Sequence, residues 1–312
     1  MKQHYPEIDA VKGIAILLVI LGHSFCTFPI NLDAEFPVLS AYVRSFQMPL
    51  FFIASGFLFS TNGPFAEFAK KKAWRLVVPW LVFCLLSLTL KVVFGSVTRH
   101  GAIDLSAALL DILQGHSYWF LYALTIIMVV CRMARNKWAL GTLCIVSVSA
   151  CAFTHIRGVN AFEVGRIVYY FPLFCFGMML RHVYARIAAC SVRTITIVTL
   201  LLMVIFVMSA QSSSGIMDYL PALSGSMMTW GVVLLLRNYK MSMVCHFGRY
   251  SLQYYLNHLL IMLPCYYAAK FIAPPPILQL LTIWLLGIGI SYVMLRVEMR
   301  FRFLRKLCGL KE

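Results

Sequence analysis

Ten apolar stretches take up almost the whole of this 312-residue chain, and short polar segments separate them. Most are close to the 20 or so residues that an α-helix needs to cross a hydrocarbon core about 30 Å thick. The composition agrees, since 61% of residues are hydrophobic and 12% are charged, against roughly half and a quarter in soluble domains. We therefore predict an all-α, polytopic integral membrane protein with about ten transmembrane helices, near residues 11–30, 45–60, 74–94, 117–133, 138–155, 166–182, 193–210, 219–236, 248–272 and 277–297.

Positive charge falls unevenly on the two sides of these stretches. If the N-terminus is cytoplasmic, 21 of the 27 lysines and arginines lie in cytoplasmic segments. The other six lie outside: Arg44, Lys91, Arg99, Arg157, Arg166 and Lys270. Lysine and arginine collect on the cytoplasmic side of membrane proteins, so this asymmetry predicts that both termini are cytoplasmic. It also explains the net charge of +16 without a nucleic-acid partner.

The apolar stretches leave little room for other structure. We expect one transmembrane domain over residues 1–312, with no separate soluble domain and no cleaved signal peptide, because the first stretch lacks a small-residue cleavage site. The ten cysteines are scattered, and no C-x-x-C pair occurs. We predict that they are small buried side chains and not disulfides, and we expect no metal site.

Asp9, Lys12 and His23 mark the first apolar stretch. An ionisable group inside an apolar span is costly and is therefore a functional candidate. Asp9 and Lys12 are three residues apart, so on a helix they can pair, while Lys12 can also be an interfacial anchor. His23 lies about 16 Å further along a helix, where a neutral imidazole can take or give a proton. A buried histidine with a purely structural hydrogen bond is the alternative.

The second stretch and the start of the third contain further residues of structural or functional interest. Pro49 and Gly56 allow a kinked helix at residues 46–57, although close helix packing through small residues is the simpler explanation. Lys72 and Arg75 open the third stretch three residues apart. We expect them to face the same way and to suit the phosphates of a cytosolic ligand.

Aromatic and charged residues open two stretches on the outer side. Trp119 suits an interfacial anchor, although its ring could also stack on a sugar, and His116 nearby is expected to be solvated. Glu163 and Arg166 are three residues apart, a spacing that suits an ordinary ion pair at a helix start. The alternative is that they form the polar rim of a substrate site.

His258 lies in the ninth stretch, about 15 Å along a helix from Gly248. That position is near mid-depth, as is His23. Two imidazoles at comparable depth suggest a shared polar cavity, and one interhelical hydrogen bond to each is the alternative.

Several of these motifs together resemble the membrane acyltransferase type 3 family. The sequence Asp9-x-x-Lys12-Gly followed by Gly22-His23 looks like the family's opening. Four further segments resemble the family and follow one another in the family's order: Phe46–Leu58, Tyr118–Leu124, Tyr169–Gly177 and Gly248–His258. Among the branches of the family, the fucose 4-O-acetylase-like group is the most similar in the general character of its sequence.

The resemblance implies a membrane O-acyltransferase, usually an O-acetyltransferase. Such an enzyme moves an acyl group from cytosolic acyl-CoA to a hydroxyl of a cell-surface or lipid-linked glycan. It implies that His23 is the essential histidine and that Lys72 and Arg75 hold the CoA phosphates. We expect His23 to act as general base or acyl relay. We also expect Asp9, the second catalytic candidate, to orient Lys12, and Lys12 to complete the CoA site. Lysine stands at two positions where many members carry arginine, which keeps the charge but loses bidentate geometry.

The expected partners are acyl-CoA, a glycan acceptor and the lipid bilayer of the cytoplasmic (inner) membrane. Acetyl-CoA is expected as a donor substrate, with no permanently bound cofactor. Trp119, Glu163, Arg166 and His258 are the candidates for contacting the acceptor. A transporter or flippase for a lipid-linked sugar or acyl group could use the same histidines for proton coupling, and a non-enzymatic membrane scaffold is a third class. The sequence predicts no oligomeric state.

Overall fold

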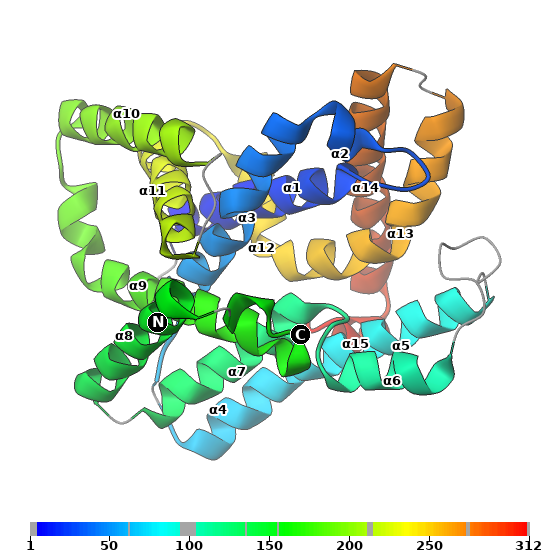
Figure 1. Cartoon of the computed structure of the whole chain (residues 1–312), viewed down its shortest axis with the longest axis horizontal. Helices are drawn as coiled ribbons and strands as arrows, with labels where there is room; N and C mark the ends of the chain where they lie inside the picture. Colours follow the sequence, from blue (N-terminus) through cyan, green and yellow to red (C-terminus); the bar gives the residue numbers. More distant parts are fainter. Residues whose placement is uncertain are drawn as a thin grey trace. The chain divides into compact units, whose positions relative to one another are not determined.

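The computed structural model describes residues 5–61, 63–93, 104–134, 136–154, 156–210, 215–272 and 275–310. Every regular element in these ranges is a helix (Figure 1), which confirms the predicted all-α class for the described part of the chain. Each of the ten predicted stretches overlaps a helix. Among the cations counted for orientation, four lie outside the described residues: Lys2, Arg99, Arg135 and Lys311.

Four helical segments are long and apolar enough to cross a membrane, judged by length and composition: Phe65–Val93, Ala161–Ala188, Val192–Ser209 and Pro276–Arg300. Two shorter helices are also apolar, Trp119–Met133 and Lys137–Phe153. These helices make the chain a multi-pass membrane protein. The number of ten spans and the cytoplasmic position of both termini stay predictions.

The helices fall into two compact units, and the expectation of one transmembrane domain stays a prediction beside this division. Unit 1 comprises residues 1–59 and 173–292. It contains the later part of α9 (Val164–Ala188) and most of α14 (Pro276–Arg300), together with these elements: α1 (Pro6–Ser24), α2 (Leu32–Glu35), α3 (Pro37–Phe57), α10 (Val192–Ser209), η4 (Gly215–Asp218), α11 (Tyr219–Leu235), α12 (Ser242–Arg249) and α13 (Ser251–Ile272).

Unit 2 comprises residues 60–172 and 293–312. It contains the first part of α9 and the end of α14, together with these elements: α4 (Phe65–Lys72), the π-helix η1 (Ala73–Val77), α5 (Val78–Val93), α6 (Leu105–Leu113), α7 (Trp119–Met133), α8 (Lys137–Phe153), η2 (Ile156–Gly158), η3 (Ala161–Glu163) and α15 (Arg302–Leu307).

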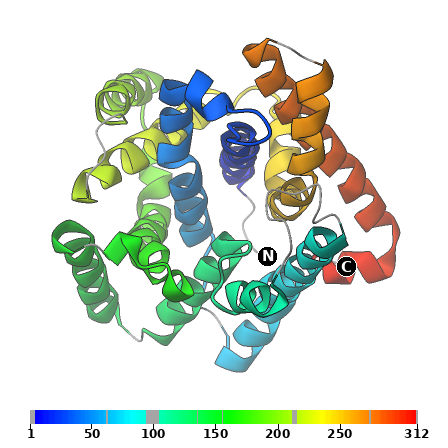
Figure 2. The ribbon, with the colours of Figure 1, turned by 45° about the vertical axis from the view of Figure 1, so that its right-hand side comes forward.

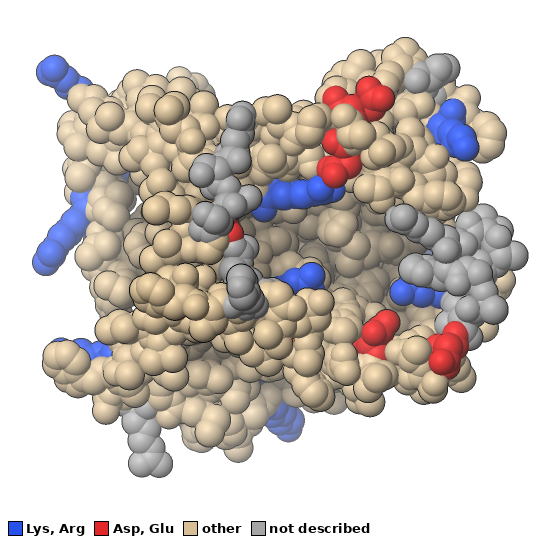
Figure 3. Space-filling model, in the orientation of Figure 1, with Lys and Arg blue, Asp and Glu red and all other residues tan. Residues whose placement is uncertain are grey.

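The surface is largely uncharged. Figure 3 shows one face on which lysine, arginine and carboxylate side chains form only small scattered groups. Large apolar side chains are exposed along α10, including Leu201, Val204 and Met208. Exposed apolar area on this scale is unusual in soluble monomers, but it suits a helix that faces lipid.

In unit 1, α1 packs against α3, α12 and α13, and Figure 2 shows α1 (dark blue) between α3 (blue) and the yellow-to-orange segments that follow α11. The contact with α12 is between backbones. A Cβ added at Gly13 would overlap the carbonyl of Val244, and one added at Gly248 would overlap the carbonyl of Asp9. Small residues at such contacts let helices in membranes approach closely.

Close backbone contact at glycines also joins α3 to α9. A Cβ at Gly56 would overlap the carbonyl of Phe174, and one at Gly177 would overlap the carbonyl of Ile53. Helix α3 runs unbroken through Pro49. Close packing through small residues therefore accounts for Gly56, as the simpler reading of this motif predicted.

The end of the first helix was predicted wrongly. The predicted stretch runs to Ile30, but α1 ends at Ser24. Proline lacks the N–H that a continuing helix needs, and Pro29 lies in the non-helical segment that follows α1. His23 therefore occupies the last turn of α1, where backbone carbonyls need partners from outside the helix. The hydroxyl of Tyr266 donates to the His23 carbonyl at 2.7 Å.

All ten cysteines are free thiols, as predicted. Most are buried, and Cys190, which follows α9, is the exposed one among the ten. They behave as small side chains that fill space between helices.

The backbone contact of α1 with α12 generates a stability prediction. Replacing Gly248 by alanine places a methyl group against the Asp9 carbonyl, and overpacking of this kind costs about 1–3 kcal/mol. Thermal unfolding of the detergent-solubilised protein should therefore begin at a lower temperature. Gly289→Ala on α14 is the control, since its added Cβ has no atom within 4 Å, and an equal change in both variants would contradict the prediction.

Candidate functional site

Unit 1 brings the two membrane histidines together. α1 carries His23 and α13 carries His258, and their ring centroids lie 5.2 Å apart with the ring planes tilted by 55°. His258 is completely buried, while His23 is exposed. A proton-transfer group must be reachable by its substrate, so of the two, His23 is the one that a reactant can touch.

Groups from α3 and α13 lie beside this pair. His258 Nδ1 lies 2.9 Å from the carbonyl oxygen of Tyr254, one helical turn earlier. A Cβ at Gly22 would overlap the side-chain amide of Gln47, so the absence of a side chain at Gly22 lets α3 bring an amide group up to the residue that precedes His23. The Gln47 Oε1 atom is buried without a hydrogen-bond partner in the described part of the chain.

Asp9 and Lys12 lie near the start of α1, and both are partly buried. The Asp9 carboxylate is 4.0 Å from Nε of Arg249, which is the last residue of α12. Lys12 and His23 both lie on α1, where a rise of about 1.5 Å per residue corresponds to a separation of about 16 Å along the helix.

Unit 2 carries the cations Lys72 and Arg75. Lys72 ends α4, and its Nζ lies 5.7 Å from the ring centre of Phe68. Arg75 lies within the π-helix Ala73–Val77, and its side chain is exposed. We predicted a shared face from α-helical spacing, but the wider π-helical turn changes that spacing. Short π-helical segments are rare and are frequent at functional sites.

The π-helix is supported from the C-terminal segment of unit 2. Gly309 has φ +68°, and a Cβ there would lie 2.9 Å from both the Arg75 carbonyl oxygen and a ring carbon of Pro79. A side chain at position 309 would therefore be strained in the left-handed region and would also press on the turn that carries Arg75.

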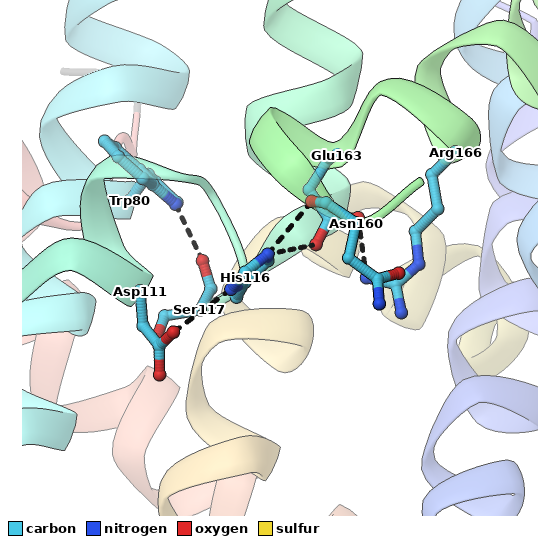
Figure 4. A network of polar contacts seen from close by, with 7 residues as sticks. All are labelled: Trp80, Asp111, His116, Ser117, Asn160, Glu163 and Arg166. Atoms are coloured by element: carbon cyan, nitrogen blue, oxygen red, sulfur yellow. Dashed lines mark hydrogen bonds and ion pairs between the residues drawn. The ribbon is translucent and has the colours of Figure 1, made fainter. Parts of the chain in front are cut away.

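A polar network in unit 2 includes Glu163 and Arg166 (Figure 4). Glu163 is buried, and its Oε2 pairs with Arg166 at 2.8 Å, which confirms the i, i+3 ion pair. The Arg166 guanidinium lies 4.6 Å from the ring centre of Trp119. Trp119 also stacks on Tyr170, with ring centroids 5.4 Å apart.

His116 is part of the same network, although solvation was expected there. Its Nε2 lies 3.0 Å from the carbonyl oxygen of Asn160, and its Nδ1 lies 3.1 Å from the Asp111 carboxylate. Both partners are acceptors, so the doubly protonated imidazolium satisfies both. These hydrogen bonds, to Asn160 first and then to Asp111, raise the pKa of His116 above its ordinary value, against a smaller effect of burial.

The backbone around this network is held in unusual conformations. Among the described residues, the non-glycine residues with positive φ are Tyr118 (52°), Phe162 (51°) and Glu163 (55°). All three border the contacts of Figure 4, where the indole of Trp80 also donates to the carbonyl of Ser117 at 2.9 Å. Such conformations cost of order 1–3 kcal/mol each and persist where surrounding contacts impose them.

The sequence around Gly115 contains a signal for the position of His116. Gly115 has φ +82° and follows α6. The amide of Gly115 donates to the carbonyl of Ile112, and that of His116 donates to the carbonyl of Asp111. This is a Schellman motif. A glycine just past an apolar helix predicts that turn, which brings the residue after the glycine back towards the last turn of the helix.

No group of three or more histidine, cysteine, aspartate or glutamate side chains that could hold a metal ion occurs among the residues that the structure describes.

The profile of the acyltransferase 3 family, described as an acyltransferase domain, matches residues 5–296. The chain belongs to this family. The match includes every site residue predicted from the sequence, in both units.

Three curated proteins are similar over part of their length. Nodulation protein NolL of Sinorhizobium fredii is 30% identical over 186 residues, which are 55% of this chain and 47% of that protein. NolL of Mesorhizobium japonicum is 31% identical over 182 residues, with the same coverage. Inner membrane protein YcfT of Escherichia coli is 29% identical over 190 residues, 48% of this chain and 50% of that protein.

The matched region is thus about half the length of each of these relatives. No solved structure matches the chain.

The His116 network predicts a dependence of stability on pH. The raised pKa means that His116 adds to the free energy of unfolding fully at pH values below its unfolded pKa of about 6.5, and that this contribution is lost as pH rises through the folded pKa. Between about pH 6 and pH 8.5, the melting temperature of the wild type should fall more than that of His116→Gln. His182→Gln, an exposed position on α9, should keep the wild-type slope, and parallel curves for all three proteins would refute the assignment.

Proposed function

We propose that this protein is a membrane O-acyltransferase of the cytoplasmic (inner) membrane, with acetyl-CoA as donor and a glycan hydroxyl as acceptor. The contact of the exposed His23 ring with the buried His258 ring carries the proposal. Membership of the acyltransferase 3 family supports it, and favours it over a transporter or flippase.

In the proposed reaction, a glycan hydroxyl attacks the thioester carbonyl of acetyl-CoA. A hydroxyl is a poor nucleophile until a base removes its proton as the new C–O bond forms, and such help is worth about 10²–10⁴ in rate. His23 takes that proton. When the C–S bond breaks, the His23 imidazolium returns the proton to the departing CoA thiolate, so the base is regenerated. A two-step variant, in which the acyl group first forms an acyl-imidazole on His23, balances equally.

Lys12, Lys72 and Arg75 are assigned to the phosphates of the donor, and Asp9 to orienting Lys12. Arg75 is an exposed residue, and a guanidinium can grip a phosphate through two hydrogen bonds, whereas each lysine acts as a point charge. The position of Arg75 in a π-helix supports a functional role.

Trp119, Glu163 and Arg166 are assigned to the acceptor. They lie in one set of contacts, in which Arg166 joins the Glu163 carboxylate to the Trp119 ring and Trp119 stacks on Tyr170. An aromatic ring beside a guanidinium offers a sugar both an apolar face and hydrogen-bond donors.

Removing the proposed base tests the chemistry. His23→Ala should lower transfer of acetyl groups by at least about 100-fold, with the protein still folded. The measurement is mass analysis of cell-surface glycans from cells that carry the wild type, the variant or neither. His182→Ala is the matched control, because it removes an exposed histidine from the same unit. Full activity of His23→Ala would end the proposal.

Removing the proposed phosphate contact tests the donor site. Arg75→Ala should weaken acetyl-CoA binding by about tenfold or more, because a hydrogen bond to a charged group contributes about 1.5–3 kcal/mol. Calorimetry on the purified protein gives the dissociation constant. Lys70→Ala, an exposed cation on α4, should change it little, and an unaltered affinity in Arg75→Ala would remove this residue from the donor site.

A further inference from the structure

One face of α13 carries buried polar side chains with unpaired hydrogen-bonding atoms. Tyr254, Asn257 and His258 are three and four residues apart and so lie on the same side of the helix, and each is completely buried. Four of their side-chain atoms have no partner in the described part of the chain: Tyr254 Oη, both polar atoms of the Asn257 amide, and His258 Nε2. Buried polar atoms are rarely left unpaired, and each exception calls for an explanation.

The contacts of His258 fix where its proton lies. Its Nδ1 is 2.9 Å from the Tyr254 carbonyl oxygen. A carbonyl oxygen can only accept, so Nδ1 carries the hydrogen. In a neutral imidazole the other nitrogen then holds a bare lone pair, and that nitrogen is the buried and unpartnered Nε2.

His23 lies beside His258. The ring centroids of His23 and His258 are 5.2 Å apart, and those of Tyr255 and His258 are 5.7 Å apart. Tyr266 holds the His23 carbonyl at the end of α1. Of the two rings that these contacts place beside His258, the His23 imidazole has an N–H to donate and is exposed to a reactant.

We propose that His258 is a positioning residue for His23, whose N–H the Nε2 atom of His258 accepts. This inference rests on the function proposed above. The hydrogen bond keeps the proton of neutral His23 on the nitrogen that faces His258, so the other nitrogen presents its lone pair to the acceptor hydroxyl. When His23 takes the hydroxyl proton, the N–H bonded to His258 stays in place, and the imidazolium keeps its orientation until it protonates the CoA thiolate.

The role is comparable to that of the residue that holds the histidine of a hydrolase triad in its working tautomer. The difference is that His258 is neutral and is itself oriented by a backbone carbonyl. Hydrogen bonds of this kind are often long in a structure without substrate and shorten in the complex.

Two substitutions at position 258 separate positioning from packing. Glutamine can imitate His258, because its amide can donate to the Tyr254 carbonyl and its oxygen can accept from His23. Leucine fills similar space and accepts nothing. In proteoliposomes with acetyl-CoA, His258→Leu should lower kcat by about 100-fold or more with KM for acetyl-CoA within about twofold, and His258→Gln should recover at least about tenfold of that loss.

Ser291→Ala is the matched control, because it removes another buried and unpartnered hydroxyl from unit 1. It should leave kcat unchanged. Wild-type kcat in His258→Leu, or equal loss in His258→Leu and His258→Gln with both folded, would overturn the proposal. A rise in KM for the acceptor with unchanged kcat would also overturn it, in favour of the substrate contact predicted from the sequence.

A second measurement does not depend on activity. Nitrogen-15 spectra of histidine-labelled protein distinguish the two imidazole tautomers, and the His23 signals are assigned by their loss in His23→Ala. The wild type should show one tautomer at His23, and His258→Leu should show a mixture of the two. If the leucine variant does not fold, His258→Met takes its place in this measurement. A mixture in the wild type would overturn the positioning role, whereas inactive wild-type protein with a single tautomer would count against the proposed function alone.

Discussion

Direct contact between helix backbones is the constraint on which unit 1 depends. α1 meets α12 at Gly13 and Gly248, and it meets the amide of Gln47 on α3 at Gly22. Dispersion and close packing stabilise helix pairs where lipid removes most of the hydrophobic driving force. Because α1 is held at these points along its length, the ring of His23 is set against α13. The glycines of the opening motif thus help to fix the helix that carries His23.

The length and apolar content of the ten stretches were enough to place the longer helices, since each predicted stretch overlaps one. The shorter helices, such as α6, were not predicted, and the helix ends depend on local contacts. α1 stops at Ser24 because of the segment around Pro29, and η1 interrupts the α-helical geometry at Arg75. His23 and His258, expected at comparable depth from helical rise, do lie side by side, with ring centroids 5.2 Å apart. The shared polar cavity suggested for them stays a prediction. The hydrogen bond between His116 and Asn160 joins residues that are 44 positions apart in the sequence. Residue spacing along one helix cannot predict such a contact.

Unit 2 shows how charge and backbone strain combine at a polar site. The Glu163 carboxylate is buried beside the Arg166 guanidinium, with the His116 ring 4.0 Å away. Glu163 itself adopts positive φ. A buried carboxylate without partners would be strongly unfavourable, so these cations and the strained turn stabilise one another. This coupling gives a short connection between apolar helices a defined conformation.

The distribution of thiols has a practical consequence. Cys190 follows α9 and is the exposed member of ten free cysteines, while most of the others are buried between helices. Thiolates react, and burial in apolar surroundings disfavours the thiolate. A maleimide dye will therefore attach first at the α9–α10 connection, so that fluorescence can follow this region in the otherwise natural sequence.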